Sequence, residues 1–190
     1  MRAALALPSA ITFVRIALFP WIAWAIVQGR FDTAVRVFMA VALTDALDGF
    51  VARRWHLATR FGTMLDPIAD KLLLVTVFAS LGWAGTVPGW LVVIVFGRDT
   101  LILLLAGVTM ATGRVRTFHP SVWGKLSTVV QAGTVVVAMV HHAHLLPEFP
   151  GGTGRVAELM YGLCALATAG SGFHYLYLWR KRLSEGGPGE

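Results

Sequence analysis

Apolar runs of about 20 residues follow one another along the whole chain, and a run of that length can cross a bilayer core as a helix. Six spans can be drawn, at residues 8–28, 33–54, 63–84, 88–112, 121–145 and 155–180. Gly29-Arg30 and Gly85-Thr86 make two of the breaks. The runs lack the period-2 alternation of a membrane strand, and lipid cannot satisfy exposed backbone groups. The sequence therefore predicts an all-α integral membrane protein, a bundle of six transmembrane helices.

Basic residues indicate the orientation of this bundle. If the spans alternate in direction, Arg30 and Arg155 lie on one side and most of the other cations lie on the opposite side, which the positive-inside rule makes cytoplasmic. Both termini are therefore predicted to be cytoplasmic. The net charge of +6 is explained by cations beside an anionic leaflet, so we expect no nucleic-acid partner.

The chain is expected to form a single membrane domain over residues 1–183. Its first run has no signal-peptide cleavage pattern and is expected to be a retained span. Residues 184–190 are rich in glycine and are expected to be a disordered tail. The single cysteine, Cys164, can form no disulfide within the chain.

Two pairs of aspartates lie where a membrane chain should carry few acids. Asp45 and Asp48 are three residues apart near the end of the second run, and Asp66 and Asp70 are four apart near the start of the third. On helices these spacings place the members of each pair on one face. The short basic connection makes the two helices antiparallel neighbours. We expect the four carboxylates to converge just inside the cytoplasmic interface.

Four carboxylates in one place need a cationic partner, because an Asp near the centre of a span costs about 2.5–3.5 kcal/mol and like charges repel. Two hard divalent cations, magnesium, manganese or calcium, would balance the four acids. The alternative interpretation is that two of the aspartates form salt bridges to Arg53 and Arg54. Small residues at Gly49, Ala52 and Gly62 leave space for a ligand to approach the backbone.

Proline follows one of these aspartates directly. Pro67 is expected either to open the third helix at its first position or to kink it. In both cases the backbone at Asp66 would be irregular, which would help to present oxygen atoms to an ion.

The acidic stretch reads Asp45-x2-Asp48-Gly49-x2-Ala52-Arg53-x8-Gly62-x3-Asp66-x3-Asp70. At every fixed position it is similar to the signature of the CDP-alcohol phosphatidyltransferase family. The segment from Pro8 to Arg15 also resembles the family, except that Ser9 stands where relatives usually carry Asn. With the six-span layout, the resemblance covers about the first 140 residues.

The resemblance implies transfer of a phosphatidyl group from CDP-diacylglycerol to an alcohol, with release of CMP. It implies that the four aspartates hold two divalent cations, magnesium or manganese, and that Asp70 is also the general base. It implies a bacterial-type inner membrane, an active site facing the cytoplasm and a homodimer. The residues that it places at the CDP-lipid are Thr12, Gly49, Ala52, Arg53 and Gly62.

Charged residues in the fourth and fifth runs are candidates for binding the acceptor. Gly97-Arg98-Asp99 and Gly124-Lys125-x2-Thr128-x2-Gln131 resemble the branch that contains the cardiolipin synthases and the glycerophosphate-using phosphatidyltransferases. By this resemblance Arg98 and Lys125 contact the acceptor phosphate, and Arg15 is expected to face a phosphate too. Arg98 and Asp99 could instead be a neutralised structural pair.

The acceptor stays open at this point. Arg followed by Asp is more like the cardiolipin synthases, which favours phosphatidylglycerol as acceptor and cardiolipin as product. Glycerol 3-phosphate, giving phosphatidylglycerophosphate, is the alternative. A divalent-ion transporter is the non-enzyme alternative, because it would also bury acids among helices. The grouping of the acids toward one membrane face argues against transport.

Overall fold

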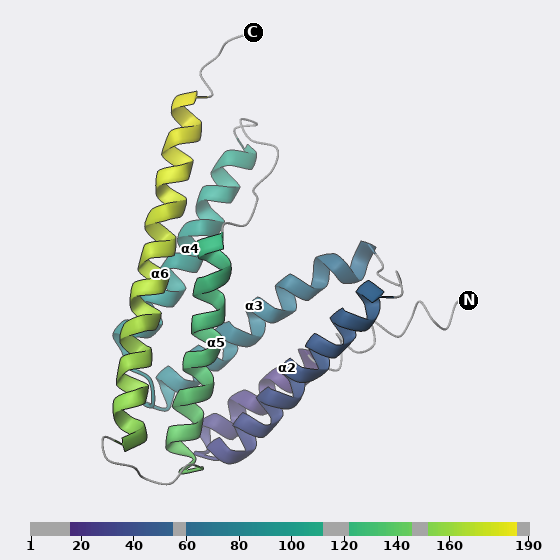
Figure 1. The fold of residues 1–190 in the computed structure, drawn as a ribbon, viewed down its shortest axis with the longest axis vertical. Helices are drawn as coiled ribbons and strands as arrows, with labels where there is room; N and C mark the ends of the chain where they lie inside the picture. Colours follow the sequence, from purple (N-terminus) through teal and green to yellow (C-terminus); the bar gives the residue numbers. More distant parts are fainter. Residues whose placement is uncertain (1–15, 55–59, 112–121, 146–151, 186–190) are drawn as a thin grey trace, which may run out of the picture. The chain divides into compact units, whose positions relative to one another are not determined.

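The computed structural model describes residues 16–54, 60–111, 122–145 and 152–185. Within these ranges the protein is helical, as predicted, and six helices are present (Figure 1). Residues 12 and 15, two of the predicted site positions, lie outside the described ranges. The helices are Ile16–Val27, α2 (Phe31–Arg54), α3 (Arg60–Trp83), α4 (Gly89–Ala111), α5 (Val122–His142) and α6 (Gly152–Glu185).

The chain divides into two compact units, which are described separately. The first comprises Met1–Val87 and Ala138–Glu148, and the second comprises Pro88–Val137 and Phe149–Glu190. The acidic stretch belongs to the first unit. Arg98 and Lys125 belong to the second.

Two helices of the first unit end in glycine turns, at the breaks that the sequence predicts. Gly29 has φ +72° and Gly85 has φ +70°, a left-handed conformation that other residues rarely adopt. The amide of Arg30 donates to the carbonyl of Ala25 at 2.8 Å, so this turn has the Schellman pattern. Apolar side chains from the first, second and third helices form the core of this unit, among them Ile22, Ile26, Phe38, Val77, Phe78 and Leu81.

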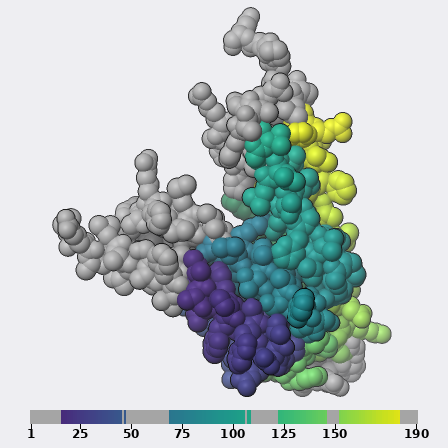
Figure 2. Space-filling view, turned by 180° about the vertical axis from the view of Figure 1, so that it is seen from behind, coloured from purple at the N-terminus to yellow at the C-terminus, as the bar shows by residue number. Residues whose placement is uncertain are grey.

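In the second unit α4 packs along α6. The space-filling view shows the surfaces of these two helices next to each other (Figure 2). The buried apolar side chains include Leu91 and Val95 of α4, Val135 of α5 and Tyr161 of α6. The same core also buries an unusual set of polar side chains, namely Arg98, Asp99, Ser127, Gln131, Thr134, Thr168 and Ser171.

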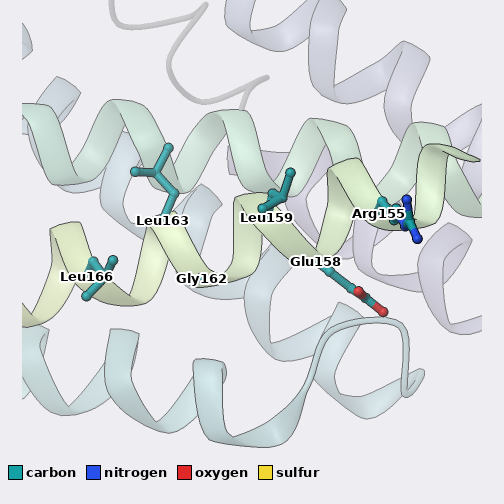
Figure 3. A pocket seen from close by; sticks show the side chains of 6 residues that line it. All are labelled: Arg155, Glu158, Leu159, Gly162, Leu163 and Leu166. Carbon is teal, nitrogen blue, oxygen red and sulfur yellow. The ribbon is translucent and has the colours of Figure 1, made fainter. Parts of the chain in front are cut away.

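One face of α6 is apolar and exposed. Leu159 and Leu166 are 74% and 75% exposed. Together with their neighbours they line an open hollow of about 620 Å³, which has charged side chains at one end (Figure 3). The lining residues are Arg155, Glu158, Leu159, Gly162, Leu163 and Leu166.

The observed helices differ from the predicted runs mainly at their ends. α6 continues to Glu185, beyond the predicted start of the tail, and residues 186–190 lie outside the described ranges. Pro67 lies inside α3, which begins at Arg60, so the prediction that this proline opens the helix is wrong. Among the described residues, two stretches are long and apolar enough to cross a membrane, Val122–His142 and Gly152–Lys181. The arrangement of all six helices in a bilayer stays a prediction.

Candidate functional site

The helical register of the four aspartates is confirmed. Asp45 and Asp48 both lie in α2, and Asp66 and Asp70 both lie in α3. Residues three or four apart on a helix lie on one face, so the two members of each pair occupy positions on the same face of their helix. Asp45 is half-buried and Asp70 is exposed, while the side chains of the other two aspartates lie outside what the structure describes.

These four aspartates, here called the aspartate signature, have the chemistry of a hard-cation site. Carboxylate oxygens are the ligands that magnesium and manganese prefer, and several converging acids balance a divalent charge. In the part of the chain whose side chains are described, no group of three or more His, Cys, Asp or Glu residues comes together. Since that part lacks the side chains of Asp48 and Asp66, the fit rests on donor chemistry and helical register.

The residues expected at the CDP-lipid belong to the same stretch. Gly49, Ala52 and Arg53 lie in the last turns of α2, and Gly62 lies in the first turn of α3. Their side-chain environments lie outside the described part of the structure. Their roles therefore stay predictions from the resemblance.

Arg98 of α4 is the best-defined candidate site residue. It is 8% exposed and its neighbour Asp99 is 7% exposed. Its Nη1 donates to Asp99 Oδ1 at 2.8 Å, and its Nη2 donates to Ser171 Oγ of α6 at 2.8 Å. The Tyr175 ring of α6 lies beside the guanidinium, with 5.8 Å from Cζ to the ring centroid. The predicted charged pair is thus present, and α6 supplies further contacts.

A glycine of α5 makes room for the side chains of Arg98 and Tyr175. A Cβ atom on Gly124 would lie 2.8 Å from Tyr175 Oη and 3.4 Å from Arg98 Nη2. A Cβ atom on Gly172 would lie 3.6 Å from Arg98 Cγ, which is ordinary contact. Lys125, the residue after Gly124, is exposed. The closest approach of Arg98 and Tyr175 to α5 therefore depends on the absence of a side chain at Gly124.

Gln131, the last residue of the predicted fifth-run motif, has a structural contact. Its Nε2 donates to Thr168 Oγ1 of α6 at 3.1 Å, and Ser127 Oγ donates to the same oxygen at 3.4 Å. All three side chains are buried. We call Ser127, Gln131 and Thr168 the polar seam; it joins α5 to α6 within the second unit.

Ser171 and Tyr175 are the residues that the sequence interpretation missed. Ser171 is 73 positions from Arg98 in the chain, and no local spacing connects two residues that far apart. A weak signal did exist. Thr168, Ser171 and Tyr175 recur at intervals of three and four residues within an apolar run, so they share one helix face.

The described part of the chain is all-α, with two helices long and apolar enough to cross a membrane, and α2 and α3 each contain two aspartates at helical spacing. A model of the CDP-alcohol phosphatidyltransferase family matches residues 5–169. The chain therefore belongs to the CDP-alcohol phosphatidyltransferase family, as the sequence resemblance predicts.

Individual relatives carry two different names. The human protein named "Cardiolipin synthase (CMP-forming)" is 29% identical over 193 residues, which covers 92% of this chain and 62% of the human protein. A Bacillus subtilis protein named "CDP-diacylglycerol--glycerol-3-phosphate 3-phosphatidyltransferase" is 31% identical over 186 residues, covering 89% of this chain and 92% of that protein. A cardiolipin synthase of Streptomyces coelicolor is 30% identical over 115 residues, 57% of this chain and 54% of that protein. The chain spans 62% of the length of both the human and the rat cardiolipin synthases.

Proposed function

We propose that this protein transfers a phosphatidyl group from CDP-diacylglycerol to an alcohol and releases CMP. The observation that carries the proposal is the placement of the complete aspartate signature on α2 and α3, at helical spacing, in a chain that belongs to this family. Phosphoryl transfer needs little covalent chemistry from a protein, but it needs charge neutralisation and alignment. Four carboxylates that hold cations and a set of basic residues are suited to both tasks.

In this proposal Asp45, Asp48, Asp66 and Asp70 hold two divalent cations, magnesium or manganese. When bound, such ions would neutralise the pyrophosphate of the nucleotide lipid and stabilise the departing phosphate. Gly49, Ala52 and Gly62 leave space for the nucleotide lipid beside the helix backbones. The guanidinium of Arg53 and the hydroxyl of Thr12 donate to its oxygens.

Asp70 acts as the general base. Its carboxylate accepts the proton of the acceptor hydroxyl while that oxygen attacks the phosphorus atom bonded to the diacylglycerol. A new P–O bond to the acceptor forms, and the P–O bond to CMP breaks. CMP leaves with the electron pair of that bond. Because the leaving group is a phosphate, no general acid is required.

Arg98, Lys125 and Arg15 bind the phosphate of the acceptor. The preferred acceptor is phosphatidylglycerol, and the cardiolipin synthases among the relatives support this choice. Glycerol 3-phosphate is the second candidate, because the Bacillus subtilis relative matches over 92% of its own length. Both acceptors carry a phosphate, so Arg98 has a function in either reaction.

The test is CMP release by the purified full-length protein in detergent, with CDP-diacylglycerol and magnesium or manganese. Parallel reactions contain phosphatidylglycerol, glycerol 3-phosphate, inositol phosphate or serine, and EDTA provides the metal-free control. Release with phosphatidylglycerol alone would establish the cardiolipin reaction, and release with glycerol 3-phosphate alone would establish the second candidate. A folded protein that releases no CMP with any acceptor would refute the proposal. Metal flux into proteoliposomes would then support a divalent-ion transporter.

A further inference from the structure

We propose that α6 completes the acceptor-phosphate site through Ser171 and Tyr175. In this proposal the two side chains are positioning residues that hold the Arg98 guanidinium so that its Nε–H is presented to an acceptor phosphate oxygen. The inference rests on the proposed function, because it assigns a ligand to Arg98. It adds a helix that the sequence motifs for the acceptor do not include.

One donor atom of the Arg98 guanidinium, Nε, has no hydrogen-bond partner among the described residues. Asp99 accepts a hydrogen bond from Nη1 and Ser171 accepts one from Nη2, so different residues occupy the two ends of the guanidinium fork. The Nε atom is buried and has no hydrogen-bond partner among the described residues. Leaving a buried donor without a hydrogen-bond partner destabilises a protein, and the effect is larger for a charged group. A charged donor kept in this state is suited to a ligand that supplies an oxygen.

The contact with Asp99 differs from that of an optimised structural pair. Arg and a carboxylate often bind with two parallel hydrogen bonds, which uses two donors of the guanidinium at once. Here the bond to Asp99 that is described involves Nη1 alone. The contact to Ser171 turns the second amino group toward α6 instead. The arrangement restricts the plane of the guanidinium and leaves Nε without a hydrogen-bond partner among the described residues.

Tyr175 restricts the guanidinium from another side. Its ring lies within cation–π range of Arg98, at 5.8 Å from the centroid. Its hydroxyl oxygen would be 2.8 Å from a Cβ atom on Gly124, which is closer than real Cβ contacts allow. A side chain at position 124 would therefore displace the ring or the guanidinium. The three helices α4, α5 and α6 together determine where Arg98 can point.

The test measures steady-state CMP release against the concentration of each substrate separately. Ser171→Ala removes the hydrogen bond to Nη2 and should raise the KM for the acceptor about tenfold, as loss of one hydrogen bond to a charged group implies. The kcat and the KM for CDP-diacylglycerol should stay within about twofold. The reason is that the Ser171 hydrogen bond positions Arg98, which in this proposal binds only the acceptor. Thermal unfolding in detergent is recorded for every variant.

A second pair of variants tests the geometry independently. Gly124→Ala should raise the acceptor KM, and adding Tyr175→Phe should reverse part of that rise, because it removes the oxygen that lies 2.8 Å from the new Cβ. The matched control on the same helix is Gly133→Ala, where the nearest atom would be Met160 Cε at an ordinary 3.5 Å. It should leave both KM values unchanged.

The outcomes separate the inference from the proposed function. One outcome would overturn the inference alone. In it the wild-type protein releases CMP, Ser171→Ala has an unaltered acceptor KM, and Tyr175→Phe does not reverse the effect of Gly124→Ala. Equal changes in both KM values, with a lowered unfolding temperature, would show a purely structural role and would also overturn it. A wild-type protein that is silent with every acceptor would overturn the proposed function and this inference with it.

Discussion

The aspartates of the proposed active site differ in how strongly their substitution should reduce activity. Asp70 has two proposed roles, as a cation ligand and as the base, whereas Asp45, Asp48 and Asp66 have only the first. Asp32 lies outside the aspartate signature, in the first turn of α2, where its Oδ2 is 3.6 Å from Arg36 Nη2. The same chemical change at Asp70 and at Asp32 therefore separates the chemistry from a general effect of lost charge.

We expect Asp70→Asn to abolish CMP release. The amide has nearly the shape of the carboxylate, but it is neutral and cannot accept a proton, and general-base catalysis contributes about 10²–10⁴-fold in rate. Because Asp70 is exposed, the fold should survive, which thermal unfolding in detergent would confirm.

Asp32→Asn is the matched control and should keep its activity. Its ion pair with Arg36 lies on a partly exposed surface, where such pairs contribute about 0–1 kcal/mol. Full turnover in Asp70→Asn would remove this residue from the role of base. Loss of turnover in both variants would point to a general charge effect.

The helices α5 and α6 are joined by buried polar side chains, and the loss of these contacts should lower the free energy of unfolding by a predictable amount. Thr168 is the acceptor for Gln131 and Ser127, and its side chain is fully buried. Hydrogen bonds between membrane helices are individually modest, yet one acceptor here serves two donors. Removing that single oxygen therefore leaves two polar groups without the partner that they share.

Thr168→Val should lower the free energy of unfolding by about 1–2 kcal/mol, since a buried donor loses its partner while the side-chain volume is retained. Thr168→Ser keeps the hydroxyl and is the matched control for the hydrogen bond. Unfolding of detergent-solubilised protein in increasing SDS would measure both. A valine variant as stable as the wild type would show that the polar seam does not hold the two helices together.

The exposed face of α6 offers a test of whether this helix contacts lipid. Leu166 is 75% exposed, and in water a lysine at such a position would change stability by only about 0.5 kcal/mol. In the centre of a membrane span it would cost about 2.5–3.5 kcal/mol. We expect Leu166→Lys to reduce the membrane-inserted fraction of the protein. Glu158→Lys, nearer the start of α6, should insert normally, and equal insertion of both variants would contradict a span through Leu166.

Much of the helix pattern was predictable from run length alone, because a bilayer core requires about 20 apolar residues per helix. Helix ends were less predictable, since they depend on local backbone preferences. α6 continues through Arg180 and Lys181, where the hydrophobic run has ended, because Lys and Arg are good helix formers. Pro67 lies inside α3, although proline is most often found in the first turn of a helix.

The candidate site divides in the same way. The helical register of each aspartate pair was predictable because its two members are three or four residues apart, a spacing that gives them a common face on any helix. Arg98 and Asp99 were recognisable as charges inside an apolar run. Ser171 was not recognisable as their partner, because its contact depends on how α4 packs against α6. Packing between two distant helices depends on the whole chain and cannot be inferred from the spacing of residues within one segment.

The molecule as a whole has charge and tryptophan patterns that support a transmembrane arrangement. Trp83 ends α3, while Trp90 and Trp123 lie in the first turns of α4 and α5, and all three are exposed. Tryptophan is enriched at membrane interfaces, where its ring is partly in lipid and its N–H reaches water. These ends are therefore suited to the interface, and the distribution of basic residues predicts which interface is cytoplasmic.

That orientation can be measured with cysteines, because the chain has only one of its own and Cys164 is buried. In a Cys164→Ala background, Gln28→Cys places a thiol at the exposed end of the first helix, and Ser184→Cys places one near the end of α6. A membrane-impermeant thiol reagent should label Gln28→Cys in intact cells. It should label Ser184→Cys only after the membrane is permeabilised. Both positions labelled from outside, or the reverse pattern, would contradict a cytoplasmic C-terminus and with it the predicted cytoplasmic face for the aspartate signature.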